Sequence, residues 1–292
     1  MKPQPLRRRL QLLQQARKVP WEVLERDYLF SWVLAAIGKS ELLRNTLVFK
    51  GGACLKKCYF GDYRFSEDLD FSCLELAPQG SNLEEAFQQV CREAEELLQS
   101  SADVRLECVR YTEREAHPHG QEAFIIRGRL PWQSKFQTRV LIEVTREEYL
   151  LWPAEQRPLL HEYGDELVGS LVSYSLSEIV AEKLRAILQQ TAKQGERNWL
   201  RPRVRDYYDL WRILSYHTEL FALPDFEARL RQKCASKDVA FADLESFFSP
   251  MMTAEVERVW VSWMTPIVPD LPEWNQVLSE LRPLVARLLG QS

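Results

Sequence analysis

The sequence lacks a long apolar run, a closely spaced cysteine pair and a strong net charge. No stretch approaches the roughly 18 to 20 apolar residues that a membrane span needs, and the basic N-terminus lacks the apolar core of a signal peptide. The six cysteines include no C-x-x-C pair and the four histidines are mostly scattered, which argues against a structural zinc site and a disulfide framework. We therefore expect a soluble cytoplasmic protein with free thiols and no membrane partner.

The net charge limits the kind of partner that the chain can bind, and its length limits the number of domains. A net charge of -4 does not favour a general polyanion binder, so any contact with nucleic acid has to be local. A chain of 292 residues, 46% of them hydrophobic, can bury a full core and is long enough for two domains.

The first half of the chain mixes helical and strand-like patterns. A double glycine, Gly51-Gly52, separates the first predicted strand from a helical stretch, and the next strand is expected to lie beside the first. These patterns predict an α+β fold with a mixed β-sheet. The predicted helices are 6–17, 21–38, 53–59 and 82–99, and the predicted strands are 46–50, 68–72, 104–111, 123–130 and 138–145.

The second half of the chain is predicted to be helical. Proline-containing connections at Pro153 and Pro158 mark the change of pattern, so we place a domain boundary near residue 150, with domains at 1–150 and 151–292. The predicted helices are 176–190, 203–216, 224–234, 240–262 and 272–289.

Carboxylates in the predicted sheet form a candidate metal site. Asp68 and Asp70 are two apart on one strand, so their side chains point to the same face. Magnesium prefers such hard oxygen ligands together with substrate phosphates, and Glu143, an acid in an otherwise apolar strand, is the candidate third ligand. The alternatives are a solvated strand edge for the two aspartates, and an ion pair of Glu143 with Arg139 or Arg146.

The double glycine is a candidate phosphate turn. A glycine turn that opens a helix lets backbone amides approach a phosphate, and Lys56 lies one turn further on. Taken alone a double glycine is weak evidence, but the Asp-x-Asp strand that follows makes the combination more specific.

Four blocks of sequence together resemble a known family. Residues 49–57 (Phe-Lys-Gly-Gly-Ala-Cys-Leu-Lys-Lys) and 63–71 (Tyr-Arg-Phe-Ser-Glu-Asp-Leu-Asp-Phe) resemble the signature of AbiEii/AbiGii-type toxins, which are nucleotidyltransferases of the polymerase-β-like superfamily. The resemblance continues in the same order at 175–188 and 203–211, so it spans residues 46 to about 214.

The resemblance implies a function as well as a fold. It implies a nucleotidyltransferase catalytic domain in residues 1–150, with a helical domain in residues 151–292 that completes the active site. Such an enzyme uses a nucleoside triphosphate and magnesium, with manganese as an alternative, to modify an acceptor, which in characterised relatives is the 3′ end of tRNA. The implied setting is a toxin–antitoxin or phage-defence system with a cognate antitoxin as partner.

The resemblance also assigns roles to single residues. Matched by position, these are Gly51 and Gly52 in the phosphate turn, Asp68 and Asp70 in the metal-binding pair, Glu143 as the third acid, and Lys183 and Asp206 as the C-terminal lysine and aspartate. Further candidates for phosphate contacts are Lys56, Arg64, Ser66 and Lys183.

The phosphate turn departs from the family pattern. Fifteen residues separate Gly52 from Asp68, slightly more than the commonest spacing, and Gly52 stands where relatives often have serine. A hydroxyl contact to phosphate would therefore be missing at this position. Backbone amides or the hydroxyl of Ser66 could supply that contact instead.

The C-terminal motif has a second interpretation. Lys183 lies near the apolar stripe of its predicted helix, where its charge needs a phosphate or an acid, and a structural ion pair with Asp206 or Asp209 would serve. A basic stretch nearby could meet the backbone of a nucleic-acid acceptor or could be an ordinary solvated face. Its members are Lys193, Arg197, Arg201, Arg203 and Arg205.

Two alternative functions remain open at the level of sequence. The nucleotide or a phosphate could go to a protein hydroxyl, including that of the antitoxin. The chain could also be a catalytically silent nucleotide-binding module.

Overall fold

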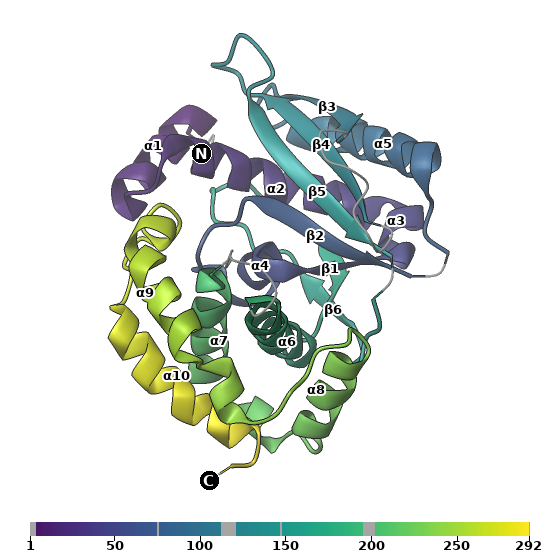
Figure 1. The fold of residues 1–292 in the computed structure, drawn as a ribbon. Coiled ribbons are helices and arrows are strands. Elements are labelled where there is room, and N and C mark those ends of the chain that lie inside the picture. Colours follow the sequence, from purple (N-terminus) through teal and green to yellow (C-terminus); the bar gives the residue numbers. More distant parts are fainter. Residues whose placement is uncertain (1–3, 75, 112–120, 147, 195–201, 292) are drawn as a thin grey trace. The chain divides into compact units, whose positions relative to one another are not determined.

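The computed structural model describes residues 4–74, 76–111, 121–146, 148–194 and 202–291 (Figure 1). Contacts divide the chain into two compact units, which we call the sheet unit (1–148 with 154–174) and the helical unit (149–153 with 175–292). The domain boundary near residue 150 stays a prediction, and residues 154–174 group with the sheet unit.

The sheet unit is built on one mixed β-sheet, which confirms the predicted α+β fold class. The strand order is β3-β4-β5-β2-β1-β7-β6, with β2 parallel to β5, β1 parallel to β7 and the other neighbours antiparallel. The strands are β1 (Leu47–Lys50), β2 (Asp68–Cys73), β3 (Arg105–Arg110), β4 (Glu122–Arg129), β5 (Thr138–Thr145), β6 (Glu155–Pro158) and β7 (Ser170–Ser173).

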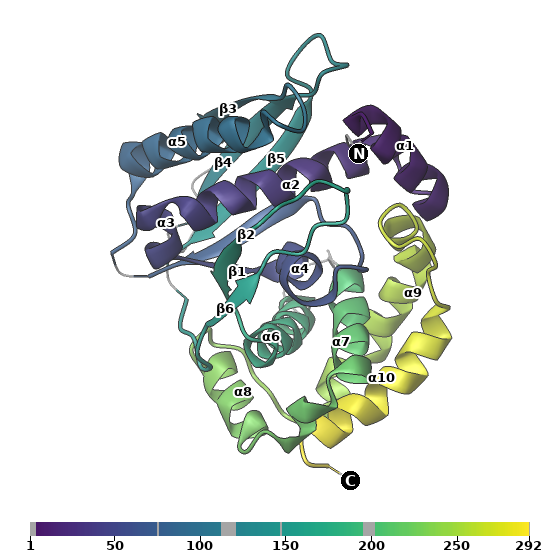
Figure 2. The ribbon, with the colours of Figure 1, turned by 180° about the vertical axis from the view of Figure 1, so that it is seen from behind.

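Helices α2 and α5 cover one face of strands β3 to β5, as the two opposite views in Figures 1 and 2 show. On β5 the buried residues are Thr138, Val140, Ile142 and Val144, whereas Arg139 is exposed and residues 141, 143 and 145 are half-buried. This alternation of apolar and polar residues gives the sheet a covered face and an open face. The helices of this unit are α1 (Leu6–Arg17), α2 (Trp21–Lys39), α3 (Glu41–Thr46), α4 (Gly51–Cys54), which continues as the π-helical turn Leu55–Phe60, and α5 (Gly80–Leu98).

The sequence missed strands β6 and β7. Both are four residues long, and β6 is an edge strand with exposed polar side chains and a proline. Such short strands show no alternation that could distinguish them from a connection. Phe49 of β1 pairs with Ser173 of β7, which extends the sheet beyond β1.

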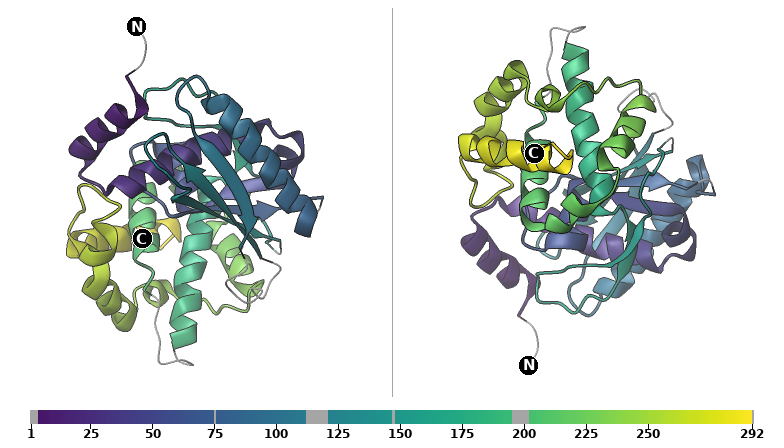
Figure 3. Two further views of the ribbon diagram at one scale, coloured as in Figure 1. Left: turned by 90° about the horizontal axis from the view of Figure 1, so that it is seen from above. Right: turned by 90° about the horizontal axis from the view of Figure 1, so that it is seen from below.

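The helical unit is arranged around α7, which packs against α6, α9 and α10 (Figure 3). Its helices are α6 (Leu176–Gln194), α7 (Val204–Tyr216), α8 (Phe226–Ala235), α9 (Pro250–Met264) and α10 (Trp274–Leu288). The prediction of one helix over 240–262 was wrong. Pro250 is the first residue of α9 and Ser249 caps it, because proline fits the first turn of a helix and disrupts its interior.

No helix in the described parts of the chain has the length and hydropathy required to cross a membrane.

Candidate active site

Two predicted carboxylates meet on neighbouring strands of the sheet. Asp70 of β2 is the register partner of Glu143 on β5, which places their α-carbons about 4.8 Å apart with both side chains on the open face. Asp68 lies two residues before Asp70 and therefore on the same face. All three carboxylates are half-buried.

The alternative partners of Glu143 are excluded for the residues that the structure describes. Arg146 binds Glu122, at 2.7 Å between its Nη2 and Oε1, and no ion pair joins Glu143 to Arg139. Neither Asp68 nor Glu143 has a hydrogen bond or an ion pair to any other described side chain. A half-buried carboxylate in this state is suited to a cation from outside the chain.

The carboxylates fit an open magnesium site better than a closed metal cage. Within the described residues, no three acidic, imidazole or thiol groups lie close enough together to hold a metal ion by themselves. Magnesium is usually held by one or two carboxylates while substrate phosphates and water fill the other positions. Asp70 and Glu143 can supply that minimal set, and the role of all three acids stays a prediction.

The double glycine is required by side chains that lie against it. Gly51 follows β1 with φ of 78°, and a Cβ there would overlap Oδ2 of Asp70 and lie 3.1 Å from its Cγ. A Cβ on Gly52 would lie 2.8 Å from Cζ of Arg64. The turn therefore brings the backbone of Gly51 against a predicted metal ligand and that of Gly52 against a guanidinium.

Arg64 and Ser66 lie beside this turn. Nη1 of Arg64 donates to the carbonyl of Phe65 at 3.2 Å and lies 3.4 Å from Oγ of Ser66. Both side chains are buried. The structure thus brings together the predicted phosphate ligands Gly52, Arg64 and Ser66, although their role in binding stays a prediction.

Lys56 is already ion-paired. Its Nζ lies 2.6 Å from Oε1 of Glu162 and 3.0 Å from the carbonyl of Gly61, and it sits over the ring of Phe65. Lys56 is buried. A carboxylate of the sheet unit itself therefore already neutralises the charge of Lys56.

Sequence reasoning missed the ion pair of Lys50 and Glu148. Lys50 is the register partner of Asp70, and its Nζ lies 2.6 Å from Oε2 of Glu148. The same carboxylate oxygen accepts hydrogen bonds from Ser72 at 3.0 Å and Tyr174 at 2.8 Å. A lysine directly before the double glycine was the available signal for Lys50, whereas Glu148 lies beyond the end of β5, where no pattern marks it.

In the helical unit, Lys183 forms ion pairs with both candidate partners. Its Nζ lies 2.9 Å from Oδ1 of Asp206 and 2.6 Å from Oδ2 of the fully buried Asp209. The predicted structural ion pair is therefore confirmed, and Arg203 approaches Asp206 at 3.7 Å. The catalytic roles of Lys183 and Asp206 stay predictions.

The basic stretch before α7 is described only in part. Arg203 and Arg205 are half-buried. Arg197, Arg201 and the side chain of Lys193 lie outside the described residues.

The chain is similar to a known protein family and to a solved structure. The family model of the nucleotidyl transferase AbiEii toxin, type IV toxin–antitoxin system, matches residues 32–280. No curated protein sequence matches the chain. The solved structure of MenT4, a nucleotidyltransferase toxin from Mycobacterium tuberculosis H37Rv, is similar with a TM-score of 0.52 and 19% identity, over 92% of this chain and 84% of that one. At this identity MenT4 shows a shared fold, whereas the family match shows membership: the chain belongs to the AbiEii family of nucleotidyltransferase toxins of type IV toxin–antitoxin systems.

Proposed function

We propose that this toxin transfers a nucleoside monophosphate from a nucleoside triphosphate to the 3′-terminal hydroxyl of a tRNA, in the cytoplasm and with magnesium. Its family implies a nucleotide substrate and an antitoxin partner. The observation that carries the proposal is the pairing of Asp70 with Glu143 on the open sheet face, next to the Gly51 turn. That arrangement combines metal-binding acids with a backbone turn that can receive phosphates.

The proposed metal ligands are Asp68, Asp70 and Glu143. Two of them, Asp68 and Glu143, have no cationic partner among the described side chains, so a divalent cation would offset their charge. Magnesium, or manganese as the alternative, would supply neutralisation of the negative charge that develops on the phosphates.

The protein groups of the site act mainly by positioning. The backbone at Gly51 and Gly52, with the side chains of Arg64 and Ser66, would hold the phosphates while the acceptor oxygen bonds to the α-phosphorus. The bond from that phosphorus to the pyrophosphate oxygen breaks, and the proton of the acceptor hydroxyl passes to solvent or to a nearby carboxylate. Lys56 would take part only by exchanging Glu162 for a phosphate.

The helical unit contributes Lys183 and Asp206 to this proposal. Asp206 can act either as a base or as an organiser of Lys183, and the ion pair between the two residues supports the second role. Two aspartates hold this lysine in position before any nucleotide binds, and their negative charge offsets part of its attraction for a phosphate.

The test is label transfer from each α-labelled nucleoside triphosphate in turn to total tRNA with magnesium present. Wild type is compared with Asp70→Ala and with Asp270→Ala, an exposed aspartate of the helical unit as the matched control. We expect label in RNA with wild type and Asp270→Ala, and none with Asp70→Ala. Retained transfer in Asp70→Ala would exclude the proposed mechanism.

The same experiment separates the alternative functions. α-Label on protein and none on RNA would assign the acceptor to a protein hydroxyl, such as one on the antitoxin. Transfer from γ-labelled nucleotide alone would indicate phosphorylation. Nucleotide binding without transfer of either label would indicate a silent module.

A further inference from the structure

The open face of strands β3 to β5 carries arginines directly opposite one another. Arg127 of β4 is the register partner of Arg139 on β5, and Arg129 of β4 is the register partner of Arg105 on β3. Residues 127 and 129 are two apart, so all four side chains are on the same face. We call these four residues the arginine face.

Opposed like charges normally destabilise a sheet, and acids of the chain offset them only in part. Arg127 lies 3.6 Å from Glu107. Neither Arg129 nor Arg139 has an ion pair or a hydrogen bond to another described side chain. Among the residues that the structure describes, the charges of Arg129 and Arg139 are therefore not neutralised by a paired acid.

Arg105 is the best neutralised member of the arginine face. It lies 3.4 Å from both Glu95 and Asp103. Its side chain is nevertheless 53% exposed, and that of Arg127 is 44% exposed. Both guanidinium groups are therefore accessible to an external anion.

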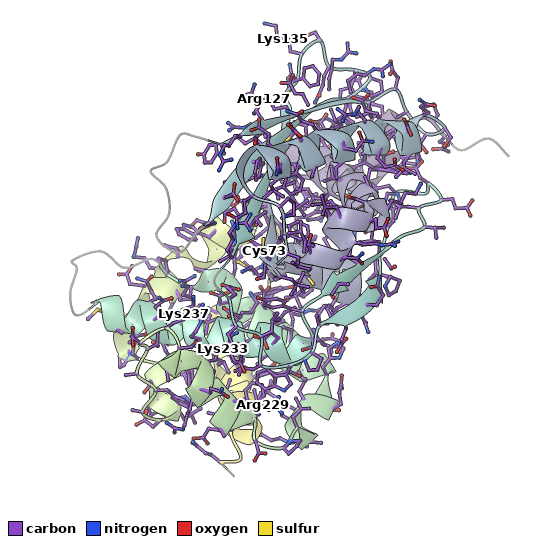
Figure 4. All side chains as sticks on the ribbon, turned by 90° about the vertical axis from the view of Figure 1, so that its right-hand side faces the viewer. Cys73, Arg127, Lys135, Arg229, Lys233 and Lys237 are labelled. Carbon is purple, nitrogen blue, oxygen red and sulfur yellow. The ribbon has the colours of Figure 1, made fainter. Side chains whose placement is uncertain are left out.

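The arginine face continues into the row of predicted metal ligands. Arg139 lies four residues before Glu143 on the same strand and the same face, which corresponds to about 13 Å along β5. The turn between β4 and β5 adds Lys135 and Phe136, which are both exposed. Arg127 and Lys135 lie at the end of the sheet away from Cys73 (Figure 4).

We propose that the arginine face, together with Lys135, binds the phosphate backbone of the nucleic-acid acceptor and directs its 3′ end to Asp70 and Glu143. Guanidinium groups bind phosphate oxygens with two parallel hydrogen bonds, and a length of about 13 Å matches about four stacked nucleotides. The exposed ring of Phe136 offers a surface on which a base can stack. This inference rests on the proposed function in one respect, that the acceptor is a nucleic acid.

Binding can be measured without catalysis. The probe is a fluorescein-labelled single-stranded RNA of twelve nucleotides, titrated with the full chain in EDTA without nucleotide and followed by fluorescence anisotropy at several salt concentrations. The variant is Arg127→Gln/Arg139→Gln. The control is Arg8→Gln/Arg44→Gln, which removes the same charge from exposed positions on α1 and α3.

Loss of two phosphate contacts should weaken binding about 25-fold at 0.1 M salt. It should also reduce the slope of the logarithm of the binding constant against the logarithm of the salt concentration by about 1.4, since each phosphate contact to a single strand contributes about 0.7 to that slope. The control should bind like wild type. The variant should unfold at the same or a higher temperature, because opposed like charges have been removed. This result separates a binding role from a structural one.

Two outcomes would overturn the inference. One is RNA binding by the variant as tight as that of the control. The other is failure of the wild type to bind the RNA. If the wild type binds fluorescein-labelled polyglutamate instead of the RNA, the arginine face would be assigned to an acidic protein partner. If RNA binding depends on the arginine face but no label is transferred to RNA, this inference stands and the proposed reaction is excluded.

Discussion

The close approach of Asp70 to Gly51 predicts an unusually large effect for the substitution Gly51→Ala. Gly51 has φ of 78°, and an L side chain in the left-handed region costs about 1–2 kcal/mol. In addition, the new Cβ would overlap Oδ2 of Asp70, so the carboxylate or the strand has to shift. Forced shifts of this kind in packed regions cost about 1–3 kcal/mol.

Gly80 provides the matched control. It has φ of 57° and lies in the same unit, but a Cβ built on it meets no atom within 4 Å. Gly80→Ala therefore measures the backbone cost alone, which is reduced by about 0.4–1 kcal/mol because alanine restricts the unfolded chain. The difference between the two substitutions isolates the collision with Asp70, for which we expect about 2 kcal/mol.

Thermal unfolding followed by circular dichroism measures both substitutions. In a unit of this size 1 kcal/mol corresponds to about 2–4 °C, so Gly51→Ala should lower the melting temperature about 4–8 °C further than Gly80→Ala. Repeating Gly51→Ala in an Asp70→Ala background removes the obstructing carboxylate and should restore the smaller, Gly80-like loss. Equal losses from Gly51→Ala with and without the Asp70 carboxylate would refute the reasoning.

Three further predictions concern buried and half-buried groups. Burial raises the pKa of Cys108 to about 12, and all six cysteines are buried and free. Ellman's reagent should therefore label no thiol of the native protein at pH 8 and all six thiols after unfolding. Rapid labelling of the folded chain would contradict this prediction. Nζ of Lys57 lies 2.7 Å from Oδ2 of the buried Asp27, so Lys57→Met should lower the free energy of unfolding in urea by about 3–5 kcal/mol. The double substitution Lys57→Met/Asp27→Leu should lower it less, because no charge is left unpaired. An equal or larger loss in the double variant would count against a paired buried charge. Burial acts to raise the pKa of Glu182, but its attraction to Arg185 and Lys233 prevails and lowers that pKa to about 2, below an ordinary value of 4.5. The folded state therefore gains stability from this carboxylate above about pH 4.5 and loses it as the pH falls towards 2, so the difference in melting temperature between wild type and Glu182→Gln should shrink over that range, and a constant difference would exclude this linkage.

The sequence by itself determined the elements that carry the candidate site. Strand-like patterns of residues predicted β2 and β5, and the double glycine correctly predicted a break between β1 and the helix that follows. These signals are local, because the face on which a side chain lies depends only on its position within its own strand. They placed Asp68 and Asp70 on one face of their strand and identified Glu143 as an acid in an otherwise apolar strand.

The tertiary structure alone decided which of these residues are neighbours. Pairing of Asp70 with Glu143 depends on the register between strands that are about seventy residues apart in sequence, and a shift by one residue would move Glu143 to the covered face. The arginine face has the same origin, since the opposition of Arg127 and Arg139 follows from the pairing of β4 with β5.

Partners of buried charges were likewise decided by tertiary structure. Helix α2 is buried almost all round, and its Asp27 is tolerated there because Lys57 and Tyr163 bind the carboxylate. Lys50 forms an ion pair with Glu148 and Lys56 with Glu162, and about a hundred residues of sequence separate the two members of each pair. Local patterns show whether a side chain is directed inward, whereas its ion-pair partner is set by the packing of distant segments, which no local pattern encodes.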